Sequence, residues 1–137
     1  MPEMDHAITV TTDLPFEDAL QVTRERLSDE GLGILSEIDL AATLKAKIGA
    51  DLPPHVILGA CRPPLAHAAI QAEPSIGVFL PCNVVVRVDD GGRTLVQAMN
   101  PEFMTQIASG AELAEVAADA KARITRALDA VAAAATA

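Results

Sequence analysis

Residues 56–86, VILGACRPPLAHAAIQAEPSIGVFLPCNVVV, decide how the rest of the chain is interpreted. Two apolar runs, each typical of a β-strand, flank a short segment that opens with Pro63 and Pro64. Proline favours the first turn of a helix, because its missing N–H would have no partner there. The stretch therefore predicts a strand, a helix and a second strand, and it holds both cysteines of the chain.

Composition limits the classes of protein to consider. The chain has 137 residues, no Trp, no Tyr and three Phe, so an aliphatic core is expected in a single domain spanning residues 1–137. Its net charge of −9 repels phosphate backbones and anionic lipids, which argues against nucleic-acid and membrane partners. No leader or membrane-spanning pattern is present, and we expect a cytoplasmic protein with free thiols.

Periodicity predicts five strands and four helical regions. The strands are expected at residues 6–12, 32–38, 55–60, 83–88 and 93–99, and the helices after Pro15, Asp39, Pro63 and Pro101. The last helical region is expected to break at Ser109-Gly110. The order βαβαβαββα predicts an α+β fold of two layers, with about five strands in one mixed sheet packed with helices. Residues 6–131 form the expected ordered core, and the Ala-rich residues 132–137 a frayed end.

Two separated motifs carry a family resemblance. ILGACRPPLAH at residues 57–67 and LPCNV at residues 80–84, together with the Asp90-Gly91-Gly92 turn, resemble the bacterial and archaeal family called domain of unknown function 302. The resemblance implies a compact α+β domain that tends to form homodimers, and it implies no reaction or cofactor. Arg62 stands where the family more often has Asn, and Asn100 where Asp is usual.

Cys61 and His67 are the candidate catalytic residues. Cys61 lies where a strand ends and a helix begins, so the helix dipole and Arg62 can stabilise a thiolate. His67 follows on the same helix, and a Cys/His pair can act as nucleophile and base or as two metal ligands. The alternative is structural: a free Cys is one of the most buried residue types, and a His is often packed and hydrogen-bonded.

The distance between Cys61 and Cys82 depends on the direction of their strands. If the helix after Pro63 makes a parallel crossover, the two residues lie at opposite ends of the sheet, about 16 Å apart, which is too far for a disulfide. If residues 76–80 lead the chain back, both thiols lie at the same end and a thiol pair becomes feasible. For Asn83, we expect a local hydrogen bond to a loop.

The leading interpretation is a non-enzymatic small-molecule-binding or sensing module that acts as a homodimer. Its expected ligand-binding residues are Cys61, Arg62, His67, Cys82 and Asn83, with an anion or carboxylate at the free amides of the helix start. The dimer is expected because the long amphipathic last helix leaves more apolar surface than one sheet covers. The alternatives are a cysteine-dependent enzyme using Cys61 and a structural domain. No metal or cofactor is expected, since no spacing motif for either is present.

Overall fold

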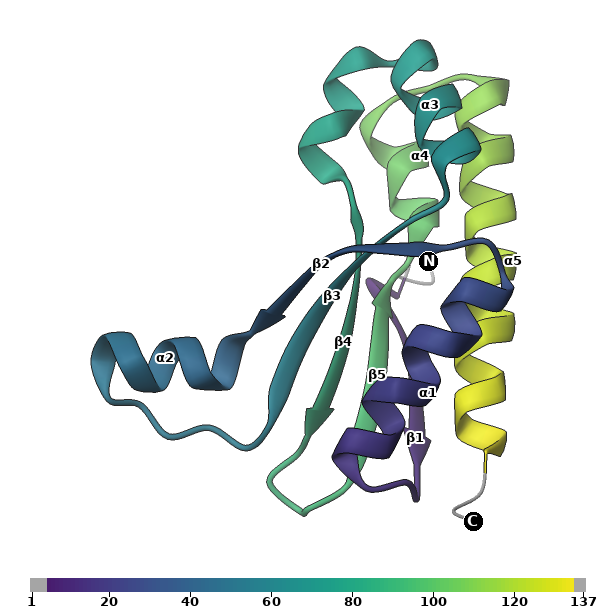
Figure 1. Cartoon of the computed structure of the whole chain (residues 1–137). Coiled ribbons are helices and arrows are strands. Elements are labelled where there is room, and N and C mark those ends of the chain that lie inside the picture. Colours follow the sequence, from purple (N-terminus) through teal and green to yellow (C-terminus); the bar gives the residue numbers. More distant parts are fainter. Residues whose placement is uncertain (1–4, 135–137) are drawn as a thin grey trace.

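The computed structural model describes residues 5–134, which form a five-stranded sheet with helices against it (Figure 1). The strands are β1 Ala7–Thr12, β2 Gly33–Asp39, β3 His55–Cys61, β4 Cys82–Val88 and β5 Thr94–Met99. Their order in the sheet is β1-β5-β4-β3-β2, so the first strand pairs with the last. The α+β class and the strand count match the sequence prediction.

Within the described residues, seven helical segments connect or follow the strands. They are α1 Phe16–Asp29, α2 Leu40–Ile48, α3 Pro63–Ala72, the 3₁₀ segments η1 Pro74–Phe79 and η2 Pro101–Phe103, α4 Met104–Ile107 and α5 Ala111–Ala133. Asp39 caps α2 by accepting a hydrogen bond from the Ala42 amide, as its position predicts. The expected break before α5 is present at Gly110, and α5 extends to Ala133. Residues 135–137 of the expected frayed end lie outside the described residues.

The prediction of a mixed sheet is wrong, because every strand pair is antiparallel. The error lies at the connection between β3 and β4. There α3 leads the chain away from the end of β3, and η1 brings it back to the same end of the sheet (Figure 1). A helix between two strands therefore does not make a parallel crossover here, and β4 returns beside β3 in the opposite direction.

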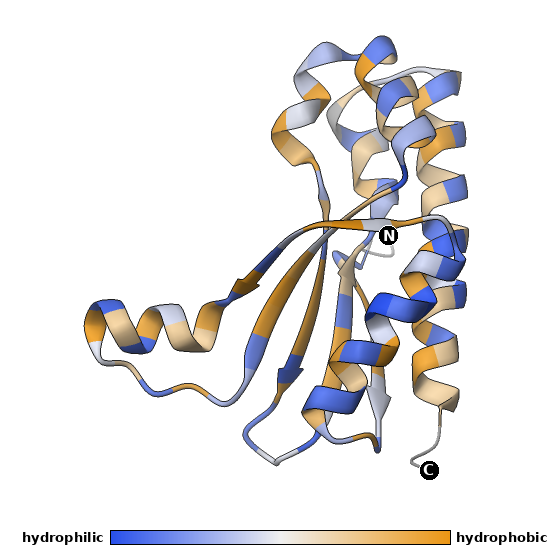
Figure 2. Cartoon of the chain, in the orientation of Figure 1, coloured by the Kyte–Doolittle hydropathy of each residue, from blue (hydrophilic) through white to orange (hydrophobic). Residues whose placement is uncertain are grey.

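The main core lies between one face of the sheet and the helices α1 and α5. Leu58 of β3, Val84 of β4 and Leu128 of α5 are fully buried in it. Long hydrophobic runs mark β3 and β4, two of the three inner strands (Figure 2). A second cluster, which includes Ile76 and Met104, packs beneath α3 and η1 against α5. Aliphatic side chains thus supply the buried packing, as the composition predicts.

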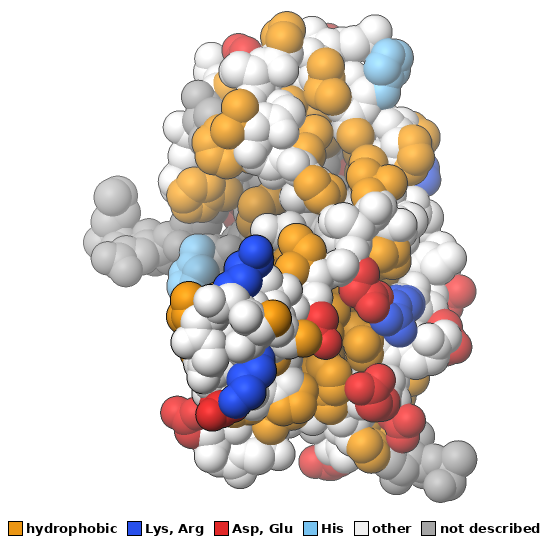
Figure 3. Space-filling model, turned by 60° about the vertical axis from the view of Figure 1, so that its left-hand side comes forward, with side chains coloured by type: hydrophobic (Ala, Val, Ile, Leu, Met, Phe, Trp, Pro, Cys, Tyr) orange, Lys and Arg blue, Asp and Glu red, His pale blue; other side chains and the backbone are white. Residues whose placement is uncertain are grey.

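Among residues 5–134, no helix packs across the other face of the sheet, and α2 projects away from the body of the molecule (Figure 1). None of the nine residues of α2 is buried. Hydrophobic side chains are spread over this side of the molecule, and the part formed by α3 and η1 shows few charged groups (Figure 3). One face of an antiparallel sheet can remain uncovered and meet solvent or a partner.

Candidate functional site

Cys61 and Cys82 lie at the same end of the sheet. Cys82 opens β4 and Cys61 closes β3, and the register pairs Ala60 with Cys82. The expectation that the two cysteines lie at opposite ends is therefore wrong, and the alternative with a returning chain is the correct one. The chain returns through the 3₁₀ turn of η1 rather than an extended segment. Both thiols are free in the structure.

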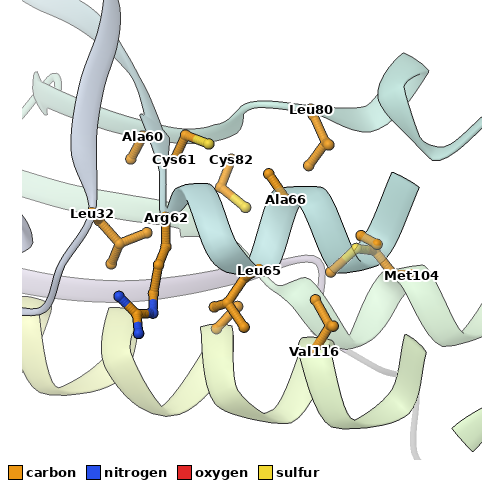
Figure 4. A pocket seen from close by; sticks show the side chains of 12 residues that line it. Leu32, Ala60, Cys61, Arg62, Leu65, Ala66, Leu80, Cys82, Met104 and Val116 are labelled. Atoms are coloured by element: carbon orange, nitrogen blue, oxygen red, sulfur yellow. The ribbon is translucent and has the colours of Figure 1, made fainter. Parts of the chain in front are cut away.

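The two cysteines border one small cavity, which we call the sulfur cavity. Its volume is about 30 Å³, and its walls include Cys61, Arg62, Cys82 and Met104 together with apolar side chains. The Met104 side chain reaches toward the cavity from the side opposite Cys61 (Figure 4). A cavity of this size holds about one water molecule, far less than the roughly 300 Å³ or more of an organic ligand site. The expected organic ligand therefore does not fit between the cysteines.

The two thiols differ in environment. Cys82 is 7% exposed, whereas Cys61 is half-buried at the cavity edge. Burial, and secondarily the neighbouring Cys61, raises the pKa of the Cys82 thiol to about 11. Cys82 is thus protonated at neutral pH, and a nucleophilic thiolate has to come from Cys61.

The start of α3 does not offer the free amides expected for an anion. Pro63 and Pro64 have no N–H, and the amides of Leu65 and Ala66 both donate to the Arg62 carbonyl oxygen. The first turn of α3 thus presents no unpaired donor, which removes the physical basis for an anion at this position.

The structure brings Arg62 to the sulfur cavity but leaves His67 outside it. His67 is exposed on α3 and lines neither this cavity nor the larger hollow described below. The aliphatic stem of Arg62 borders the cavity, while its guanidinium extends toward α5 (Figure 4). The Arg62 Nε atom is buried without a hydrogen-bond partner. A Cys61/His67 catalytic pair therefore has no geometric support.

A larger hollow, which we call the open hollow, lies on the uncovered face of the sheet. Its volume is about 420 Å³, which is within the range of small-molecule sites. It is lined by His6, Ala7, Phe79, Asn83, Val85, Gln97, Ala98, Met99 and Phe103. Asn83 is exposed here on β4, on the sheet face opposite Cys82, because side chains alternate along a strand. The five predicted ligand-binding residues are thus divided between two sites and the surface.

Sequence reasoning missed Phe79 and Phe103, which border the open hollow. Phe79 is 41% exposed and Phe103 is 40% exposed, although an aromatic ring usually buries most of its surface. The sequence carried only a weak signal: Phe79 lies between the helix expected after Pro63 and the strand expected at residues 83–88, whereas Phe103 lies in the region expected to be helical after Pro101. Exposed aromatic rings beside a concave surface are typical of ligand and partner sites.

A row of polar side chains crosses the sheet at the edge of the open hollow. Arg87 donates from Nε to Gln97 Oε1 at 2.8 Å, and Gln97 Nε2 donates to Thr9 Oγ1 at 3.2 Å. Next to this row, burial and then the charge of Arg87 lower the pKa of His55. Because the Gln97 amide is engaged on both sides, Asn83 is the amide in the hollow that remains available to a ligand.

Comparison with known proteins places these features in a family. The family described as domain of unknown function DUF302 matches residues 8–131. A solved structure, that of an uncharacterised conserved DUF302 protein from Bacillus stearothermophilus, is similar with a TM-score of 0.83 and 30% sequence identity. The alignment covers 90% of this chain and 96% of that chain. No curated protein matches this chain. Within residues 5–134, no helix has the length and hydropathy needed to span a membrane.

Proposed function

This chain belongs to the DUF302 family, which is described only as a domain of unknown function, and we propose that it is a non-enzymatic small-molecule-binding or sensing module acting as a homodimer. The observation that carries the proposal is the open hollow of about 420 Å³ with two half-exposed phenylalanine rings. A concave, mostly apolar surface with a few polar groups is the usual form of a ligand site.

The lining favours a small molecule with an apolar body and one polar or carboxylate end. Phe79, Phe103 and Val85 offer apolar contact, and burying this surface drives binding. The Asn83 side-chain amide has two N–H donors for the polar end, and His6 lies at the rim. The anionic ligand expected from the sequence is thus proposed in the open hollow instead of at the start of α3.

A probe that combines an apolar body with an anionic group tests this proposal. The fluorophore 1-anilinonaphthalene-8-sulfonate should bind saturably to the folded chain, and Phe79→Ala and Phe103→Ala should each weaken binding. Val78→Ala is the matched control, since Val78 is 81% exposed next to Phe79 but does not line the hollow. Non-saturable binding, or equal binding by all variants, would favour the purely structural alternative.

The second copy is proposed to pack against β2 and α2. A nine-residue helix is marginal in water by itself, so α2, which buries no residue, needs a packing partner. Leu35 is 67% exposed and Ile48 is 74% exposed on this projecting unit. A two-fold pairing brings the same apolar patch of both copies together, so each α2 can cover the other copy. The proposed compartment is the cytoplasm, and no nucleic-acid or membrane partner is proposed.

A cysteine-dependent enzyme is the second candidate, because Cys61 and Cys82 share one cavity. With a peroxide as oxidant, the two thiols would form a disulfide, and their two hydrogens and two electrons would reduce the peroxide to water or to an alcohol and water. Thiol labelling at neutral pH separates this candidate from the binding module. Rapid labelling of Cys61 that peroxide abolishes, with loss of two hydrogens by mass spectrometry, would favour the enzyme.

A further inference from the structure

One buried residue, Asn100, is hydrogen-bonded to two of the segments that form the rim of the open hollow. Asn100 directly follows β5 and is 4% exposed. Its Nδ2 donates to the Asp5 carbonyl oxygen at 2.9 Å, and its backbone N–H donates to the His6 carbonyl oxygen at 3.0 Å. These two bonds fasten the segment that carries His6, a lining residue of the open hollow, to the end of β5.

The other two hydrogen bonds of Asn100 hold the turn that carries Phe103. Asn100 Oδ1 accepts from the Glu102 amide at 3.1 Å, and the Asn100 carbonyl oxygen accepts from the Phe103 amide at 3.1 Å. The first of these bonds caps η2, a single 3₁₀ turn of three residues. A second tether of η2, the ion pair between Glu102 and Lys121, is partly exposed to solvent, and pairs of this kind contribute little. The position of the Phe103 ring therefore depends on Asn100.

We propose that Asn100 is the positioning residue of the open hollow, and that its hydrogen bonds hold His6 and Phe103 in place before a ligand enters. Asn100 does not itself line the hollow, so it acts through these two neighbours and not by touching the ligand. An amide is suited to this position because it supplies a donor and an acceptor at once. Walls that are fixed in advance reduce the conformational entropy that binding costs. This inference rests on the proposed ligand site, but the positions of the two rim residues can be measured without a ligand.

The chain has three Phe, so ¹⁹F NMR of the protein labelled with 4-fluorophenylalanine gives one signal for each ring. Asn100→Leu keeps a side chain of similar size and removes both side-chain hydrogen bonds. We expect it to move the Phe103 signal and to leave the signal of Phe16, which packs against the main core, unchanged. Asn100→Asp keeps the acceptor for the Glu102 amide, so it should return the Phe103 signal toward its position in the parent chain.

Two further variants of the NMR experiment separate Asn100 from other contacts. Lys121→Met removes the exposed ion pair to η2 and is the matched control, in which the Phe103 signal should stay in place. Asn100→Asp loses the donor to Asp5, so the His6 amide should become more mobile, with a lower ¹H–¹⁵N nuclear Overhauser effect. This second readout decides the proposal even if Asn100→Leu does not fold.

Three results of these measurements would overturn the proposal. They are a Phe103 signal that moves as much in Lys121→Met as in Asn100→Leu, equal movement of the Phe16 and Phe103 signals in Asn100→Leu, and a His6 amide whose mobility Asn100→Asp does not change.

The effect on binding is measured with N-phenyl-1-naphthylamine, a neutral fluorophore that does not respond to added charge. Asn100→Leu should weaken its affinity about tenfold, as when the population able to bind falls in the same proportion. In a double-mutant cycle, Phe103→Ala should cost less affinity in the Asn100→Leu chain than in the parent, whereas Phe79→Ala should cost the same in both. Additive losses for Phe103→Ala would contradict the positioning role. Failure of the parent chain to bind the fluorophore would remove the proposed ligand site, while the NMR signals would still decide the role of Asn100.

Discussion

Cys61 and Cys82 lie at the same end of the sheet, where both border one small cavity, because β3 and β4 are antiparallel neighbours with Ala60 opposite Cys82. The proximity has an electrostatic consequence. Burial disfavours ionisation of the Cys82 thiol and raises its pKa, and the neighbouring Cys61 adds to this effect. Cys82 is therefore protonated at neutral pH.

The raised pKa of Cys82 predicts a loss of stability at high pH. The pKa of this thiol rises from 9.0 to about 11 on folding, so between these values the unfolded chain has lost the proton that the folded chain keeps. The stabilisation is complete below pH 9.0 and is lost as the pH rises to about 11. The expected loss is about 2 to 3 kcal/mol in the free energy of unfolding, measured by urea melts across this pH range.

The matched variant for this measurement is Cys82→Ala. It removes the titrating thiol, so its unfolding free energy should decline less over the same pH range than that of the parent chain. Lysine titration contributes equally to both chains and cancels in the comparison. Parallel pH profiles for the two proteins would contradict the prediction.

Local features of the sequence were sufficient to place the elements. Asp39 accepts the amide hydrogen bond of a helix cap, and the turn at Asp89 joins β4 to β5, with Gly92 at a positive φ of 83°. Strand direction was not predictable in the same way. The direction of β4 depends on whether the chain after α3 returns to the same end of the sheet, which packing of Ile76 in the second cluster decides.

The candidate site was predicted only in part. Cys61 and Arg62 both border the sulfur cavity, because a strand end and a helix start are adjacent along the chain. The sequence prediction assigned Cys82 and Asn83 to one site. These neighbouring residues face opposite sides of the sheet, and only the register shows which side is covered. The open hollow requires β1, β5 and η2 to meet, which are distant in sequence.

Gly59 is predicted to be intolerant of a side chain. A Cβ atom at this position would collide with the Ser36 hydroxyl and lie 2.8 Å from Pro81 Cγ. Gly59→Ala should therefore destabilise the chain by about 1 to 3 kcal/mol in urea melts. Gly77→Ala is the control, because a Cβ there meets nothing within 4 Å, and its effect should stay below about 1 kcal/mol. Equal stability of both variants would refute the steric argument.

Asn100 is predicted to require an amide instead of a carboxylate. Asn100 is 4% exposed, donates from Nδ2 to the Asp5 carbonyl oxygen at 2.9 Å and accepts from the Glu102 amide. Asn100→Asp keeps the acceptor, loses the donor and places a negative charge against a carbonyl oxygen. The expected cost is about 1 to 3 kcal/mol at neutral pH.

The pH dependence of the Asn100→Asp variant checks the cause of this loss. A protonated Asp can donate as the amide does, so its pKa should be raised on folding and the variant should regain stability as the pH falls. Asn83→Asp is the control, because Asn83 is exposed and should show neither effect. A cost that does not change with pH would point to altered packing instead of the lost donor.

The proposed dimer predicts that a charged side chain in place of Ile48 disrupts the contact between the two copies. Ile48 is 74% exposed at the end of α2, and Glu at this position would place a charge in the proposed contact between two copies. Ile48→Glu should therefore convert the dimer to a monomer by light scattering, with little change in the far-ultraviolet circular dichroism of the rest of the fold. Each copy has a net charge of −9, so added salt should strengthen the parent dimer by screening repulsion.

Ile70→Glu distinguishes a specific interface from general apolar adhesion. Ile70 is 43% exposed, but it lies on α3, away from the unit formed by β2 and α2. Because a two-fold interface uses one patch on each copy, a charge outside that patch should leave the dimer mass unchanged. A monomeric parent chain at micromolar concentration would remove the homodimer from the proposed function, and dissociation by both variants would place the contact elsewhere. Loss of the dimer in Ile48→Glu alone would identify α2 as the contact element, and would explain why a helix without a buried residue is retained.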